Sequence, residues 1–163
     1  MLRKEISFFL KNVPGELGNL AAALNREGIN IEALTIQDAS AYVMELFNAR
    51  GKALKRIAST ESYHSMRRDS NEYALVRLLV DETDKTIDLL SQHDYIFDIN
   101  PVIAVYMDNG PGILAEVASK LGAEGININY VYASVGQACE KCLVIFSPED
   151  LDRAARIFGT VPS

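Results

Sequence analysis

The sequence predicts an α+β protein built from two copies of one small βαββαβ unit. The first observation is an internal repeat, because the stretch from Asn12 to Ile31 recurs without a gap from Asn109 to Ile128, 97 residues later. The second is that each copy has an apolar run, a turn with Pro and Gly, a helical pattern and another apolar run. This period indicates a duplicated domain rather than a solenoid, whose repeats are much shorter.

The first copy contains all six elements of such a unit. Its helices are expected at 15–27 and 82–92, and its strands at 4–10, 29–38, 73–80 and 95–99. The first helix follows from apolar residues at helical spacing, Leu17, Leu20, Ala21 and Leu24. Gly28 should end this helix, since glycine is common just past a helix C-terminus. The second helix has Asp81 and Asp84 near its positive N-terminal end.

The second copy repeats this order, but the sequence signal for its last strand is weaker. Its helices are expected at 112–124 and 148–158, and its strands at 102–107, 126–135 and 139–146. Ser147 is predicted as the N-cap of the last helix, with Pro148 in its first turn. A final strand is barely present, which leaves an edge that another subunit could complete. The resulting pattern is ferredoxin-like, with antiparallel sheets and helices on one face.

The two copies differ by a long insertion in the first. The expected domains are 1–99 and 100–163, and the first carries an inserted segment at about 41–71. Apolar residues at roughly helical spacing predict at least one helix there, bent near Gly51. Six Lys and Arg against three Asp and Glu give this segment a net charge of +3, so the remainder carries −9. It is interpreted either as a solvated surface excursion or as a docking arm for an acidic partner.

Composition limits the classes of function. The chain has 163 residues, 48% hydrophobic and 23% charged, with a net charge of −6. An acidic body argues against nucleic-acid binding. No apolar run approaches the roughly 20 residues of a membrane span. The N-terminus runs directly into a strand, so we expect no signal peptide and a cytoplasmic protein.

The strand-to-helix junctions are the candidate binding sites. A helix N-terminus attracts anions, carboxylates included, and Gly15 or Gly112 would let a ligand approach the backbone. Asn12 and Asn109 precede these helices, and an Asn side chain offers both a donor and an acceptor. Together such groups can hold the carboxylate and ammonium of a free amino acid. The alternative is structural: the Asn residues cap the helices, and Pro and Gly only form the turn.

These motifs resemble the ACT domain, a small regulatory module. The segments that carry the resemblance are 12–17 with 28–31, and 109–114 with 125–130. The resemblance implies that ligands, usually amino acids, bind at domain or subunit interfaces beside the first strand-to-helix loop. It also favours the second copy, whose connection between strands is the more regular. The ligand-binding residues that it implies are Asn12, Val13, Pro14, Gly15, Glu16, Leu17, Asn30, Ile31, Asn109, Gly110, Pro111, Gly112, Ile113, Leu114, Asn127 and Ile128.

Other residue patterns give weaker evidence for a functional site. Cys139 and Cys142 have C-x-x-C spacing, but the run continues into an expected strand, where residues three apart point to opposite faces. A zinc site would need two more ligands, and the two histidines, His64 and His93, are expected at the surface. We therefore expect no metal, no cofactor and no catalytic residues.

The sequence thus predicts a non-catalytic sensor that binds an amino acid or similar metabolite at ACT–ACT interfaces. Small halves indicate a homodimer. One alternative is a regulatory subunit of a separate enzyme, similar to the small subunit of acetolactate synthase, with the basic insertion as its docking surface. Another is a redox enzyme acting through Cys139 and Cys142.

Overall fold

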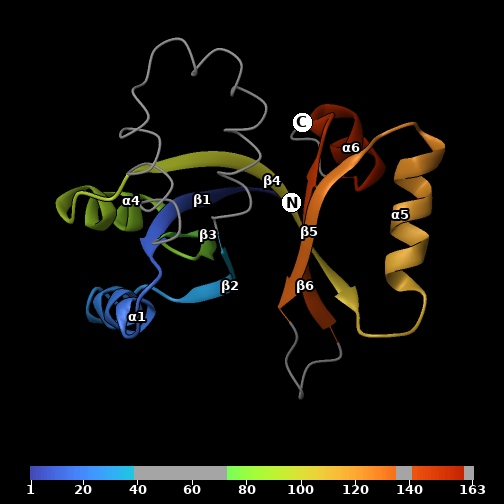
Figure 1. The fold of residues 1–163 in the computed structure, drawn as a ribbon. Helices are drawn as coiled ribbons and strands as arrows, with labels where there is room; N and C mark the ends of the chain where they lie inside the picture. The colour runs from blue at the N-terminus through green and yellow to red at the C-terminus, as the bar shows by residue number, and fades with distance from the viewer. Residues whose placement is uncertain (39–72, 135–140, 160–163) are drawn as a thin grey trace, which may run out of the picture.

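The computed structural model describes residues 1–38, 73–134 and 141–159 (Figure 1). Its strands are β1 (Leu2–Lys11), β2 (Ile31–Asp38), β3 (Tyr73–Val80), β4 (Phe97–Asp108), β5 (Ile128–Ser134) and β6 (Lys141–Pro148). Its helices are α1 (Glu16–Arg26), α4 (Thr83–Gln92), α5 (Ile113–Ala123) and α6 (Leu151–Ile157). The predicted insertion at 41–71, which contains His64, lies outside the described residues. Cys139 of the C-x-x-C motif also lies outside them.

The six strands form one antiparallel sheet in the order β2-β3-β1-β4-β6-β5. Figure 1 shows α1 and α4 packed beside one half of this sheet and α5 and α6 beside the other. Side chains that contact these helices, such as Ile6 of β1 and Ile103 of β4, lie on the same face of the sheet. The predicted α+β class with ferredoxin-like halves and helices on one face is confirmed.

Strand β4 joins the two halves. The sequence predicts separate strands at 95–99 and 102–107, whereas β4 runs unbroken from Phe97 to Asp108. Its first part pairs with β1 and its last part with β6, so it passes from one half of the molecule to the other (Figure 1). The Met1 ammonium donates to the Ala104 carbonyl at 2.9 Å, and the Ala104 N–H donates back to Met1 at 2.8 Å. The start of β1 therefore pairs with β4 at the place where a final strand of the second half would lie.

Two apolar cores lie between the sheet and the helices. The first core gathers buried residues of β1, β3, α1 and α4, with Phe8 and Leu24 among the largest. The second gathers residues of β4, β6, α5 and α6 around Phe146 and Leu121. Each helix pair thus packs on its own section of the shared sheet.

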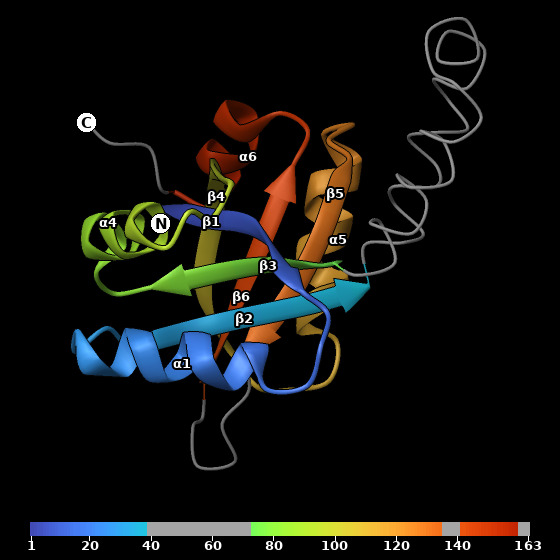
Figure 2. The ribbon, with the colours of Figure 1, turned by 60° about the vertical axis from the view of Figure 1, so that its left-hand side comes forward.

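The opposite face of the sheet is curled, and we call it the concave face. A third apolar cluster, after the two cores, lies on this face. It consists of small and branched residues of β2, β3, β4 and β6: Ala33, Leu79, Val102, Ala104, Leu143 and Ile145. The curl brings the two edge strands, β2 and β5, into contact, and Tyr132 of β5 packs against this cluster. Figure 2 shows β2 and β5 from a second direction.

Both repeats end their helices as predicted. Gly28 and Gly125 adopt positive φ angles of 68° and 66°. The following N–H groups, of Ile29 and Ile126, donate back to the carbonyls of Leu24 and Leu121. This 6→1 bond is the Schellman arrangement, which satisfies a carbonyl left open at the helix end.

The predicted start of the last helix is wrong. Strand β6 continues through Pro148, and Asp150 caps α6 by accepting a hydrogen bond from the Arg153 N–H at 3.0 Å. Ser147 instead pairs with Tyr130 of β5. Strand pairing therefore extends past the Ser-Pro signal, and the cap moves three residues along the chain.

None of the helices in the described part of the chain is both long enough and apolar enough to span a membrane.

Candidate functional site

The second junction, residues 109–114, connects β4 to α5. Gly112 is the N-cap residue with a φ of 89°, and no side chain hydrogen-bonds to this cap. The structure therefore does not support the interpretation of Asn109 as a capping residue. The first N–H groups of a helix have no partner within the helix, so this end of α5 can accept an anion.

A cavity of about 280 Å³ opens beside the second junction. Four of the predicted site residues line it: Asn109, Gly110, Ile113 and Leu114. The rest of the lining comes from β4, β5 and β6: Met107, Asp108, Val131, Tyr132, Ala133, Cys142 and Val144. The lining is thus mostly apolar, and Asp108 and Asn109 are among its polar residues.

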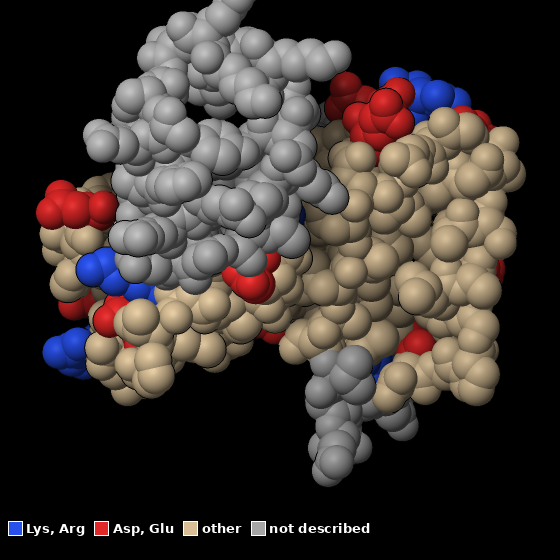
Figure 3. Space-filling model, in the orientation of Figure 1, with Lys and Arg blue, Asp and Glu red and all other residues tan. Residues whose placement is uncertain are grey.

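The surface around this cavity carries few charges. Figure 3 shows a broad area over α5 and β5 that is nearly free of Lys, Arg, Asp and Glu. Two large apolar side chains at the cavity, Leu114 and Val131, are 52% and 40% exposed. Exposed apolar side chains around a cavity are a common feature of surfaces that bind a ligand or another protein.

The first junction, residues 12–17, has the same backbone but different charges. Gly15 is the N-cap residue of α1 with a φ of 94°, again without a side-chain cap. The half-buried Glu16 occupies the first turn, where the second junction has Ile113. Lys11 precedes this junction, where Asp108 precedes the second. Burial, followed by the negative charge of Glu16, raises the pKa of the Tyr95 phenol nearby.

The second pair of predicted Asn residues lies elsewhere. The Asn30 N–H donates to the Asp81 carboxylate at 2.9 Å, and the Asn127 carbonyl accepts from the Glu149 N–H at 2.9 Å. In each repeat an 11-residue helix separates this Asn from the junction. Such a helix is about 16 Å long, so the two Asn residues of one repeat are not brought together.

The other predicted site residues divide between surface and core. Ile31 and Ile128 begin β2 and β5 and pack against the first and second cores. Val13 and Leu17 are exposed at the first junction, as are Pro14 and Pro111 at the turns.

A polar cluster on the concave face has no counterpart in the sequence prediction. The fully buried Glu5 of β1 accepts hydrogen bonds from the phenols of Tyr130 at 2.6 Å and Tyr132 at 2.7 Å. The Arg77 Nε lies 3.9 Å from the Glu5 carboxylate, and its guanidinium packs 4.1 Å from the centre of the Tyr130 ring. Arg77 interrupts the apolar sequence of β3, whereas Glu5 follows Arg3 and Lys4 in β1 and gives no such signal.

The two phenols of this cluster are held protonated. Burial raises the pKa of Tyr130, and the hydrogen bond to Glu5 raises it further. Burial and the negative charge of Glu5 likewise raise the pKa of Tyr132. Each phenol therefore remains a hydrogen-bond donor to Glu5, and the cluster ties β1 and β3 to β5.

The metal and redox candidates lie only partly within the described residues, since Cys139 and His64 are outside them. No group of three or more His, Cys, Asp and Glu side chains in these residues could hold a metal ion. Cys142 is a half-buried free thiol in β6, and His93 is exposed after α4.

Comparison with known proteins supports the fold. No curated protein matches the sequence. Protein BT0572 from Bacteroides thetaiotaomicron is 24% identical with a TM-score of 0.70, over 98% of this chain and 88% of that one. The ligand-free regulatory subunit of aspartate kinase from Thermus thermophilus is 12% identical with a TM-score of 0.56, over 99% and 96%. Its counterpart from Thermus flavus is 13% identical with a TM-score of 0.52, over 94% and 91%.

The family follows from the sequence match itself. The model of the ACT domain pair matches residues 43–159, which is more than half of the chain. The match includes the second junction and all of β3, β4, β5 and β6. The chain belongs to the ACT domain pair family.

Proposed function

We propose that this ACT domain pair is a regulatory protein whose second junction binds a free amino acid or a closely related carboxylate. The observation that carries this proposal is the uncapped N-terminus of α5 opening into a mostly apolar cavity of about 280 Å³. The helix end and the Asn109 amide would hold the ligand carboxylate. Asp108 would hold the ammonium, and the apolar walls would contact the side chain.

The protein is proposed to act by binding rather than by catalysis. A ligand with different affinities for two states of the protein shifts the balance between them, and this shift is the regulatory signal. The low-charge surface around the cavity would be covered by a second copy of this chain, so that ligand and dimer stabilise one another. Light scattering of the purified protein, with and without ligand, tests this coupling.

A regulatory subunit of a separate enzyme is the second candidate. This candidate uses the same low-charge surface as its interface, which a larger partner enzyme would cover in place of a second copy of this chain. The two candidates differ in what the ligand changes. Under the first, ligand alters the oligomeric state of the pure chain, whereas under the second it alters only the activity of a co-purifying enzyme.

A thermal-shift screen against the twenty amino acids, followed by calorimetry, tests the binding site. A ligand that binds only the native state raises the melting temperature by mass action. Asn109→Asp places a carboxylate at the second junction and should abolish most of the binding. Asn12→Asp makes the same change at the first junction and should leave it intact. Equal affinity in both variants would contradict the assignment to the second junction.

A further inference from the structure

We propose that the concave face holds a separate binding site for an α-amino acid with a large apolar side chain. The site is a cavity of about 470 Å³ that shares no lining residue with the cavity at the second junction. This volume lies within the range of small-molecule pockets, about 300–1,000 Å³.

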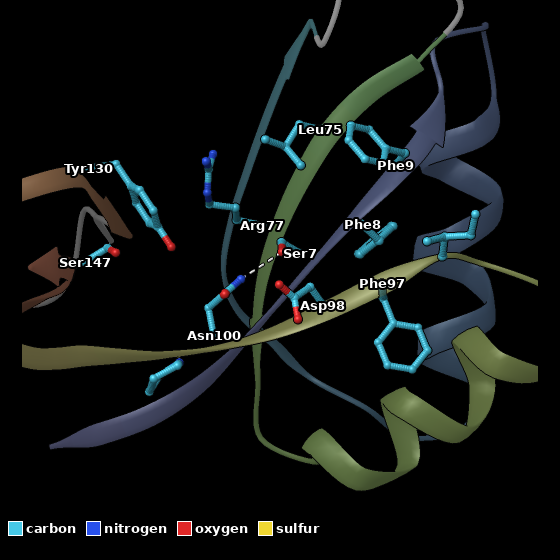
Figure 4. Close-up of a pocket in the computed structure, with 12 residues that line it drawn as sticks. Ser7, Phe8, Phe9, Leu75, Arg77, Phe97, Asp98, Asn100, Tyr130 and Ser147 are labelled. Atoms are coloured by element: carbon cyan, nitrogen blue, oxygen red, sulfur yellow. Dashed lines mark hydrogen bonds between the residues drawn. The ribbon is translucent and has the colours of Figure 1, made fainter. Parts of the chain in front are cut away.

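The floor of the cavity is a charged pair separated by a small residue. Ser7 of β1 lies directly opposite Arg77 on β3 and opposite Asp98 on β4. Adjacent strands are about 4.8 Å apart, so the Cα atoms of Arg77 and Asp98 are separated by about 10 Å. The small Ser7 side chain leaves a hollow between them. Figure 4 shows Ser7 between Arg77 and Asp98, with the Arg77 guanidinium directed away from Asp98.

The Arg77 guanidinium is positioned and still has donors to offer. The Tyr130 ring and the Glu5 carboxylate fix its place. Glu5 takes its short hydrogen bonds from Tyr130 and Tyr132, so it does not depend on Arg77 for them. Arginine has five N–H donors in a fork that matches a carboxylate, and here they border an open cavity.

Asp98 is the complementary group. Its carboxylate accepts only the N–H of the next residue, Ile99, at 2.9 Å, and no cation of the described residues lies within ion-pair distance. A carboxylate in this position suits an ammonium group. Arg77 and Asp98 thus present opposite charges to one molecule, as a zwitterion requires.

The walls of the cavity orient such a ligand. Phe9 and Leu75, which are paired across β1 and β3, form an apolar side together with Ile96, whose side chain is 81% exposed. Asn100 forms the polar side and donates to the Ser7 hydroxyl at 2.9 Å (Figure 4). The ligand side chain would therefore lie over the apolar side and cover Ile96.

The site is completed by the second half of the chain. Tyr130 of β5 and Ser147 of β6 are partners in the strand register and line the same cavity. A ligand held between them and the floor residues of β1, β3 and β4 would bridge the two halves. Binding would therefore favour the curled arrangement of the sheet.

Methyl NMR of Ile- and Leu-labelled protein, titrated with L-leucine and L-phenylalanine, tests the proposal. We expect shifts at Ile96 and Leu75 that Asp98→Asn reduces at least tenfold in apparent affinity. The matched probe is 4-methylpentanoate, which lacks the ammonium of leucine. Its weaker binding should be kept or strengthened in Asp98→Asn, because it makes no ion pair with Asp98 and its own carboxylate is repelled by that charge.

The same spectra separate this proposal from the one for the second junction. Shifts confined to Ile113 and Leu114, and lost in Asn109→Asp, would show binding at the junction alone and overturn the concave site. The absence of shifts at Ile96 and Leu75 with either amino acid would overturn it too. Shifts at Ile96 and Leu75 that survive Asn109→Asp but not Asp98→Asn are the expected result.

Discussion

The first and second junctions have nearly the same backbone but different side chains around the turn, although both helices carry an acidic residue in the first turn. Both place a glycine with positive φ as the N-cap, and neither helix receives a side-chain cap. In the first junction, Glu16 already supplies a negative charge to the helix end, and Lys11 stands before it. In the second, Ile113 and Asp108 take these positions and border a mostly apolar cavity, and the acidic residue of the first turn, Glu116, is paired with Lys120 at 2.7 Å. The two copies thus share the turn, and under the proposed function the side chains around it determine which copy binds a carboxylate.

Both junctions belong to one continuous sheet, and Glu5→Ala is the substitution that we expect to destabilise this sheet most. The change leaves two buried phenols without their acceptor and Arg77 without its buried counter-charge. We expect a loss of about 3 kcal/mol in the free energy of unfolding, as for other broken buried charge networks.

Urea unfolding measures this loss, and Glu5→Gln is the matched control because it keeps an acceptor oxygen. We also expect one cooperative transition in the wild type, since β4 belongs to both halves. Two separate transitions in the wild type would contradict the description of a shared sheet.

Exchanging the first-turn residues tests the comparison itself. Ile113→Glu should weaken ligand binding at the second junction by about 5- to 700-fold, because like charges near a protein surface repel by about 1–4 kcal/mol and each 1.4 kcal/mol is tenfold. Glu16→Ile should create a weaker binding event at the first junction, where Lys11 still opposes the ligand ammonium. Calorimetry reports both affinity and stoichiometry, and unchanged values in both variants would contradict the account.

The smallest expected effect concerns Tyr95. Burial raises its pKa first, and the Glu16 charge raises it further. Glu16→Gln should therefore lower the pKa of Tyr95 while leaving it above the ordinary value, since burial remains. Ultraviolet titration of the phenol, with Tyr95→Phe subtracted, measures the change. A pKa that rises or stays fixed would show that Glu16 does not charge this helix end.

Most of the fold could be predicted from the sequence because its signals are local. The repeat, the helical spacing of Leu20 and Leu24, and Gly28 after the helix each depend on neighbouring residues. The junctions could be located for the same reason. The cavity beside the second junction depends on walls contributed by β5 and β6, which no local pattern specifies.

The continuity of β4 could not be predicted because Pro101 indicates a break. Its nitrogen faces away from β1, since Ala104 and the even-numbered residues direct their polar groups toward β1. Pairing with β6 begins only at Ile103. Pro101 therefore forfeits no hydrogen bond of the sheet, and the strand continues through it.

The polar cluster of the concave face could not be predicted either. Glu5 and Tyr130 are 125 residues apart and meet only because the sheet curls. Arg77, a single charged residue in the apolar strand β3, indicates that a partner must satisfy it, but not which residue does.

The most direct test of the central claim is an amide NMR titration with the amino acid that gives the largest thermal shift. The backbone N–H groups of Ile113 and Leu114 would receive the ligand carboxylate, whereas those of Glu16 and Leu17 form the matched internal control. The expected result is a saturable shift of the first pair with little change in the second. Equal shifts at both helix ends, or shifts at Glu16 and Leu17 alone, would contradict the claim that the second junction is the binding site.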